Sequence, residues 1–250
     1  MLEVEGITVR FAGLTAVSDV SFAVAPGEVL TVMGPNGAGK TTAFNAITGI
    51  VRLASGSVHF EGVDVSRLRP HEIAARGIRR TFQNNGILTE MTVLENVLTG
   101  LELSTPSDLA GIVLGLRPSV RAEIEAVRTA ELQLRDLGIL DLADRPAGAL
   151  SFGQQRLVEI SRALVSGARL IMLDEPAVGL SPADRIHLGE MLRTVAGRGI
   201  GILLVEHVQD LVMAVSDRIV VLNYGKKIAE GVPEDVRRNT TVLEAYLGTS

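Results

Sequence analysis

Residues 34 to 41 read Gly34-Pro35-Asn36-Gly37-Ala38-Gly39-Lys40-Thr41, and this octapeptide is the strongest indication of the fold class. It matches the phosphate-binding loop G-x-x-x-x-G-K-[ST], in which glycines let the backbone curl until several N–H groups face an anion. An apolar run, residues 29–33, precedes the loop, and a helix-forming segment follows it. This strand, loop and helix order is the context that the motif requires, so the stretch predicts a nucleoside triphosphate site in an α/β domain.

The end of the loop supplies charge and a hydroxyl group. Lys40 adds a mobile positive charge, and Thr41 offers a hydroxyl to Mg²⁺. A helix beginning near Gly39 would point the positive end of its dipole at the phosphates. The predicted phosphate-binding residues are therefore Gly34, Pro35, Asn36, Gly37, Ala38, Gly39, Lys40, Thr41 and Thr42.

A second apolar run, residues 170–173, ends in two carboxylates, Asp174 and Glu175. An acid at the end of a buried strand can hold Mg²⁺ directly or through water, because hard cations prefer oxygen ligands. A solvated acid pair capping a strand is the alternative interpretation. The four apolar residues before the pair and Pro176 after it favour the magnesium site.

Two further segments carry polar residues at informative places. Ser151-Phe152-Gly153-Gln154 opens a helix-forming stretch, where a hydroxyl and free N–H groups can bind an anion, although an ordinary N-capped helix uses serine in the same way. His207 follows the apolar run 201–205 and so falls at a strand end, where parallel α/β sheets place their ligands. The other histidines, His59, His71 and His187, lie in segments typical of surface strands or helix starts.

The order of these motifs, with the glutamine of Thr81-Phe82-Gln83 between them, resembles the ATP-binding-cassette (ABC) ATPases over essentially the whole chain. The resemblance implies an α/β P-loop NTPase of the ABC nucleotide-binding-domain type, with an antiparallel β subdomain and an inserted α-helical subdomain. It implies one ABC ATPase domain over residues 1–250. The core would take residues 1–85 and 156–250, and the helical subdomain residues 86–155, with the signature motif near its end.

The resemblance also implies residue roles. Glu175 would orient or deprotonate the water that attacks the γ-phosphate, while His207 would contact that phosphate. Lys40 and Gln83 would complete the catalytic set, and the magnesium ligands would be Thr41, Gln83 and Asp174. Ser151, Gly153 and Gln154 would close over ATP held by a second cassette, so that two sites form across a head-to-tail dimer.

Four positions bear on how closely the chain follows the family. Phe11 comes after the first strand, where these ATPases carry an aromatic residue that stacks on adenine, although a core phenylalanine is the alternative. Phe152 replaces the usual glycine of the signature motif. Ser181 stands where aspartate is usual, and Val208 where an acid is common. The substitutions at Phe152 and Ser181 put local contacts in question, but not the sites themselves.

The stretch Arg79-Arg80-Thr81-Phe82-Gln83-Asn84, the Glu-Pro-Ala-x-Gly-Leu stretch and the end of the chain resemble the branched-chain amino-acid importer ATPases. This resemblance implies ATP with Mg²⁺, a second identical or paralogous ATPase subunit, two transmembrane permease subunits and, indirectly, a solute-binding protein. It places the chain at the cytoplasmic face of the cell membrane, held there by the permeases. Urea and short-chain amide importers share the subfamily and a lipopolysaccharide-export ATPase is more distant, so the cargo stays open.

Composition and length disfavour several other classes of protein. A formal charge of −5 disfavours nucleic-acid binding, and the basic pairs Arg79-Arg80, Lys226-Lys227 and Arg237-Arg238 are expected to be solvated. The absence of cysteine excludes disulfides and thiolate sites. A P-loop kinase would have no use for the signature motif, and 250 residues leave no room for the coiled coil of repair cassettes or the second cassette of translation factors.

Periodicity predicts the remaining elements. Residues 1 to about 33 and 56–65 alternate like strands, and further strands are expected near 169–173, 200–205 and 217–223. Residues 92–103 and 118–137 carry apolar side chains at helical spacing. No apolar run reaches the roughly 18 residues that a membrane-spanning helix needs.

Overall fold

The computed structural model describes residues 1–81, 86–101 and 117–247. The chain divides into two compact units. The core unit takes residues 1–80, 169–178 and 185–250, and the helical unit takes residues 81–168 and 179–184. The functional subdomain predicted over residues 86–155 stays a prediction, because these two units are defined only by how densely their residues contact one another.

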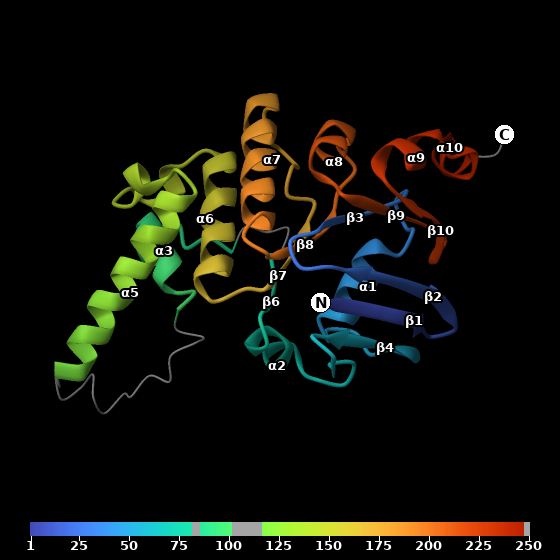
Figure 1. Ribbon diagram of the computed structural model, residues 1–250, viewed down its shortest axis with the longest axis horizontal. Helices are drawn as coiled ribbons and strands as arrows, with labels where there is room; N and C mark the ends of the chain where they lie inside the picture. The colour runs from blue at the N-terminus through green and yellow to red at the C-terminus, as the bar shows by residue number, and fades with distance from the viewer. Residues whose placement is uncertain (82–85, 102–116, 248–250) are drawn as a thin grey trace. The chain divides into compact units, whose positions relative to one another are not determined.

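The core unit is built on a six-stranded sheet with the strand order β10-β9-β3-β8-β7-β6 (Figure 1). Its pairs are parallel except for β9 and β10, which run antiparallel. Strands buried on both faces read as continuous apolar runs, as β7 and β8 do. The strands are β3 (Val29–Met33), β6 (Ile78–Arg80), β7 (Leu170–Asp174), β8 (Gly201–Val205), β9 (Arg218–Asn223) and β10 (Lys226–Gly231).

A second, antiparallel sheet in the same unit has the order β2-β1-β4-β5. Buried and exposed residues alternate along β2 and β4, as expected of strands with one solvated face. This sheet is the antiparallel β component that the family resemblance implies, and that prediction is confirmed. Its strands are β1 (Leu2–Phe11), β2 (Leu14–Val24), β4 (Ser55–Phe60) and β5 (Val63–Asp64).

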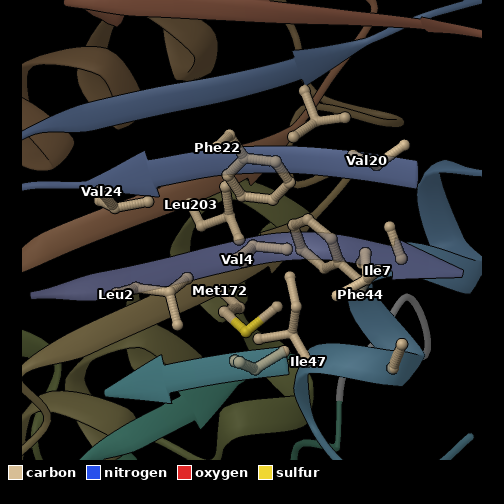
Figure 2. Packing of buried hydrophobic residues seen from close by; sticks show 14 of the residues in the cluster. Leu2, Val4, Ile7, Val20, Phe22, Val24, Phe44, Ile47, Met172 and Leu203 are labelled. Atoms are coloured by element: carbon tan, nitrogen blue, oxygen red, sulfur yellow. The ribbon is translucent and has the colours of Figure 1, made fainter. Parts of the chain in front are cut away.

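Helix α1 (Lys40–Ile47) follows the phosphate loop and packs against both sheets (Figure 2). Phe44 and Ile47 are fully buried in one cluster with side chains from β1, β2, β7 and β8, including Met172 and Leu203. Burying one such side chain stabilises the fold by roughly 1.5–3 kcal/mol. The packing therefore fixes the start of α1, where Lys40 lies. The other helices of this unit are α2 (Pro70–Ala75), α8 (Gln209–Val215), α9 (Pro233–Arg238) and α10 (Thr240–Leu247).

The helical unit contains α3 (Val93–Leu98), α5 (Arg117–Asp136) and α6 (Phe152–Val165), which pack against one another. Two 3₁₀ turns, Leu140–Leu142 and Ala147–Ala149, connect α5 to α6. Helix α7 (Pro182–Ala196) begins in this unit and continues in the core unit. Among the described helices, none is long and apolar enough to cross a membrane.

The helix predicted over residues 92–103 is shorter in the structure. Helix α3 ends at Leu98, and residues 99–101 form a turn. At Gly100 the backbone comes so close to α6 that a Cβ atom would lie 2.3 Å from the Arg162 carbonyl oxygen. Gly100, a poor helix former, thus lies two residues beyond the end of α3 at a close tertiary approach that apolar spacing cannot report.

Candidate nucleotide site

The phosphate loop joins β3 to α1, and its glycines adopt backbone conformations that other residues avoid. Gly34, Gly37 and Gly39 have φ angles of 150°, 80° and 98°. A Cβ atom on Gly34 would lie 2.2 Å from the Leu222 carbonyl oxygen, and one on Gly39 would lie 2.6 Å from that of Ala16. Strands β9 and β2 thus enclose the loop so closely that only glycine fits at these two positions.

Lys40, the first residue of α1, folds back over the loop that precedes it. Its Nζ donates hydrogen bonds to the carbonyl oxygens of Gly34 at 2.8 Å and Pro35 at 3.0 Å. Burial lowers the pKa of Lys40, and the negative charges of Glu175 and Asp174 oppose that shift. The ammonium group therefore shares one electrostatic environment with both predicted carboxylates.

Asp174 ends β7 and is 3% exposed. Its Oδ2 accepts a hydrogen bond from Arg80 at 3.0 Å, while its buried Oδ1 has no partner among the described residues. Buried carboxylate oxygens are normally paired, and an unpaired one at a strand end fits a metal ligand.

Arg80 is a site residue that sequence reasoning missed. The prediction that Arg79-Arg80 forms a solvated face is wrong, because Arg79 is buried and the side chain of Arg80 is only 8% exposed. Besides Asp174, the Arg80 guanidinium donates to Asn45 Oδ1 of α1 at 2.6 Å and lies over the Phe44 ring at 5.6 Å. It follows the apolar Ile78 on a short strand, so a period-2 pattern over three residues was too brief to reveal its burial.

Glu175 and His207 come together at the ends of neighbouring strands. The Glu175 N–H donates to the Val205 carbonyl oxygen at 2.8 Å, extending the parallel ladder of β7 and β8 by one bond. The Nδ1 atom of His207 lies 3.8 Å from Glu175 Oε1. Glu175 is partly exposed and His207 is exposed, so both side chains can reach a ligand at this edge.

The remaining predicted contacts of the core unit lie on accessible positions. Thr41 is exposed and Thr42 is partly exposed in the first turn of α1. Phe11 ends β1 opposite Leu14 at the tip of the β1–β2 hairpin, and it is 45% exposed. That exposure removes the alternative of a core phenylalanine and leaves a ring face accessible for stacking. The remaining predicted ligand, Gln83, lies outside the described residues.

A turn between β9 and β10 also braces the phosphate loop, and the sequence offered no motif for it. The Gly225 N–H donates to the Ala38 carbonyl oxygen at 3.0 Å, and the Gly225 carbonyl oxygen accepts from the Ser18 N–H at 2.7 Å. A Cβ atom on Gly225 would lie 2.6 Å from the Ala16 carbonyl oxygen. The loop is therefore held from two sides by backbone that is far away in sequence.

In the helical unit, Ser151 caps α6 through a reciprocal pair of hydrogen bonds with Gln154. We call residues Ser151–Gln154 the signature turn. Ser151 Oγ accepts from the Gln154 N–H at 3.3 Å, and Gln154 Oε1 accepts from the Ser151 N–H at 3.1 Å. Phe152 is 68% exposed, and Gly153 is buried. At the start of α7, the Oγ of Ser181 accepts from the Asp184 N–H at 3.2 Å, as predicted for a helix start.

Comparison with known proteins identifies the family to which this chain is similar. The family described as ABC transporter matches residues 17–178, and the family described as branched-chain amino acid ATP-binding cassette transporter matches residues 226–250. The chain is 40% identical over 249 residues to the high-affinity branched-chain amino acid transport ATP-binding proteins BraF of Pseudomonas aeruginosa and LivG of Escherichia coli. In both cases the match covers 99% of this chain and 98% of the relative.

Comparison with solved structures indicates the same family. A nucleotide-free ATP-binding cassette from an ABC transporter superposes with a TM-score of 0.87 at 36% identity, covering 100% of this chain and 99% of the other. An ATP-binding cassette in its ADP conformation gives a TM-score of 0.86 at 36% identity, with the same coverage. The chain belongs to the ABC transporter family and is one of its ATP-hydrolysing cassettes.

Proposed function

We propose that this chain is the ATPase subunit of an importer for branched-chain amino acids. The observation that carries the proposal is the similarity to BraF and LivG along nearly the whole chain, together with the match of residues 226–250 to the branched-chain amino acid cassette family. In this proposal two cassettes bind ATP between them, and their closure moves two permease subunits in the membrane. The chain would then be peripheral to the cytoplasmic face of that membrane.

The phosphate loop and Lys40 would bind the β- and γ-phosphates, while Phe11 would stack on the base. Because Nζ of Lys40 already lies against two loop carbonyl groups, phosphate oxygens would replace weak acceptors with charged ones. The signature turn of a second cassette would close over the same ATP. Its Ser151 hydroxyl is accessible for this role because the residue is exposed.

The chain also offers ligands that fit Mg²⁺. The unpaired Oδ1 of Asp174 and the exposed hydroxyl of Thr41 are hard oxygen donors, and Gln83 would be a third. Within the described residues, no three His, Asp or Glu side chains gather as a metal cluster. Such sparse protein ligation suits Mg²⁺, which keeps waters and substrate phosphates as ligands and neutralises their charge.

The carboxylate of Glu175 would orient the attacking water and accept its proton as the water oxygen bonds to the γ-phosphorus. The bond from that phosphorus to the β-γ bridging oxygen breaks, releasing ADP and phosphate. His207 would contact the γ-phosphate from the same edge, since its ring lies 3.8 Å from Glu175. Lys40 would stabilise the negative charge on the transferring group.

The test is a pull-down with tagged Glu175→Gln chain from gently solubilised native membranes in Mg-ATP. Glutamine cannot accept the proton, so this variant should hold ATP in a closed dimer and retain its permeases. Lys40→Ala, which removes phosphate binding, is the matched control. We expect two polytopic permeases and a solute-binding protein that binds leucine, isoleucine or valine in isothermal titration. A solute-binding protein that takes urea or an amide, or a lipid-export partner, would overturn the cargo.

A further inference from the structure

We infer that Glu206 is a positioning residue that holds Glu175 and His207 in their working arrangement. The inference rests on the proposed roles of those two residues. It adds a role for a third residue, which would contact neither the phosphate nor the attacking water. Glu206 is 0% exposed, directly after β8. A carboxylate costs free energy when it is removed from water, unless hydrogen bonds replace the lost solvent.

The Glu206 carboxylate is satisfied by backbone N–H groups from two segments. Its Oε1 accepts from the N–H of His207 at 2.8 Å and from that of Val208 at 3.1 Å. Its Oε2 accepts from the N–H of Ala177 at 3.0 Å. One side chain thus joins the backbone that carries His207 to the segment that follows Glu175.

This link begins where the sheet stops. Asp174 and Val205 are the last register partners of β7 and β8, and the bond from the Glu175 N–H to the Val205 carbonyl oxygen is the last ladder contact. After this bond, the segments that follow β7 and β8 no longer pair as strands. The Glu206 carboxylate accepts hydrogen bonds from both segments instead, so the relative position of Glu175 and His207 depends on it.

The backbone at Glu175 explains why such a link is needed. Glu175 has a φ of 49°, in the left-handed region that a residue with a Cβ atom occupies at a cost of roughly 1–2 kcal/mol. Its conformation is fixed on one side by its own N–H bond to Val205, and two residues later by the Ala177 bond to Glu206. Without the second bond, Glu175 can relax to an ordinary conformation and carry its carboxylate away from the attacking water.

The side chain of His207 is affected through the same group. Its Nδ1 lies 3.6 Å from Glu206 Oε1 and 3.8 Å from Glu175 Oε1, so the exposed imidazole has a carboxylate near it on both segments. Removing Glu206 would free both the backbone and the ring of His207. A misplacement of about 1 Å can cost on the order of 10²-fold in rate, even when no reacting group is lost.

The experiment measures steady-state ATP hydrolysis and nucleotide affinity for the purified full-length chain carrying Glu206→Gln or Glu206→Ala. We expect kcat to fall roughly 10²-fold in the alanine variant while the Kd for a fluorescent ATP analogue changes less than about 3-fold. The glutamine variant should be intermediate, because an amide has only one acceptor oxygen and can satisfy only one of the two segments.

Ile202→Ala is the matched control, because it creates a buried cavity in the strand that precedes Glu206 and lies outside the cluster that holds α1. Compared at equal folded fraction by circular dichroism, it should keep wild-type kcat. If the Glu206 variants lose only thermal stability, as this control does, the positioning role is wrong. The glutamine variant keeps the volume of the side chain and so provides a measurement if the alanine variant does not fold.

A double variant separates this inference from the proposed function. Adding Glu206→Gln to Glu175→Gln should slow turnover by a smaller factor than Glu206→Gln does in the wild type, because part of the effect of Glu206 acts through Glu175. Multiplied losses in the double variant would contradict the coupling. Undiminished turnover in Glu175→Gln by itself would instead overturn the proposed role of Glu175.

Discussion

The phosphate loop of the core unit and the signature turn of the helical unit both place polar groups at the start of a helix, but they are held in different ways. The loop is enclosed by backbone from β2, by the end of β9 and by the turn after it. The signature turn is satisfied within four residues by the capping pair of Ser151 and Gln154. One site depends on long-range contacts, and the other is local and exposed.

The difference matches what each site would have to do. A loop that grips phosphates needs N–H groups fixed before the ligand arrives, and tertiary contacts from distant strands provide that preorganisation. A turn that would meet another cassette, as proposed, needs an accessible face and little dependence on its own surroundings. Substitutions in the loop should therefore disturb the fold and the site together, whereas substitutions in the turn should disturb the site with little cost to the fold.

The strongest test of this contrast compares two glycine substitutions. Gly39→Ala puts a Cβ atom 2.6 Å from the Ala16 carbonyl oxygen at a φ of 98°, while Gly153→Ala meets the movable side chain of Asp184 at 2.8 Å. Overpacking with a strained backbone should destabilise the Gly39 variant by about 4 kcal/mol, against about 1 kcal/mol for the Gly153 variant. Urea unfolding of both variants measures the difference.

Nucleotide binding adds a second readout to the glycine pair. Gly39→Ala should lose binding of a fluorescent ATP analogue, and Gly153→Ala should retain it in the isolated chain. Equal destabilisation of the two variants would contradict the distinction between a braced loop and a local turn.

The second test removes the cation beneath the core site. Arg80→Met takes away the partner of Asp174 and leaves a buried carboxylate, which should destabilise the chain by about 3 kcal/mol. Arg237→Met on the exposed end of α9 is the control and should change stability by less than about 0.5 kcal/mol. Similar unfolding midpoints for the two variants would show that the buried ion pair carries no stability.

These residues show how far the sequence could predict the molecule. Motif spacing and apolar strands predict Gly34 to Thr41, Asp174 and His207 as site residues, because both patterns report local order directly. Arg80, Glu206 and Gly225 were missed, because each acts through a contact with a segment at a distant place in the chain. An arginine at the end of a strand, or a glutamate directly after one, cannot be told from a solvated residue until the partner segment is known.

The third test addresses the local site. Ser151→Ala removes the acceptor for the Gln154 N–H and should destabilise the helical unit by only about 1 kcal/mol, the usual cost of losing an N-cap. Thr92→Ala, which removes the equivalent cap of α3, should cost a similar amount. ATP hydrolysis distinguishes them, since only Ser151→Ala should abolish turnover that requires two cassettes. Equal turnover in both variants would leave Ser151 as a cap alone.

The smallest expected effect is a pH dependence confined to the core site. Because burial lowers the pKa of Lys40 in the folded chain, unfolding takes up a proton between that lowered value and the ordinary 10.5. Stability attributable to Lys40 therefore rises as pH increases through this window, since the cost of burying its charge disappears there. Urea unfolding of wild type and Lys40→Met between about pH 8 and pH 11 should show the wild type gaining relative to the variant. Lys226→Met, at an exposed position, should parallel the wild type, and a flat or falling difference for Lys40→Met would contradict the buried charge.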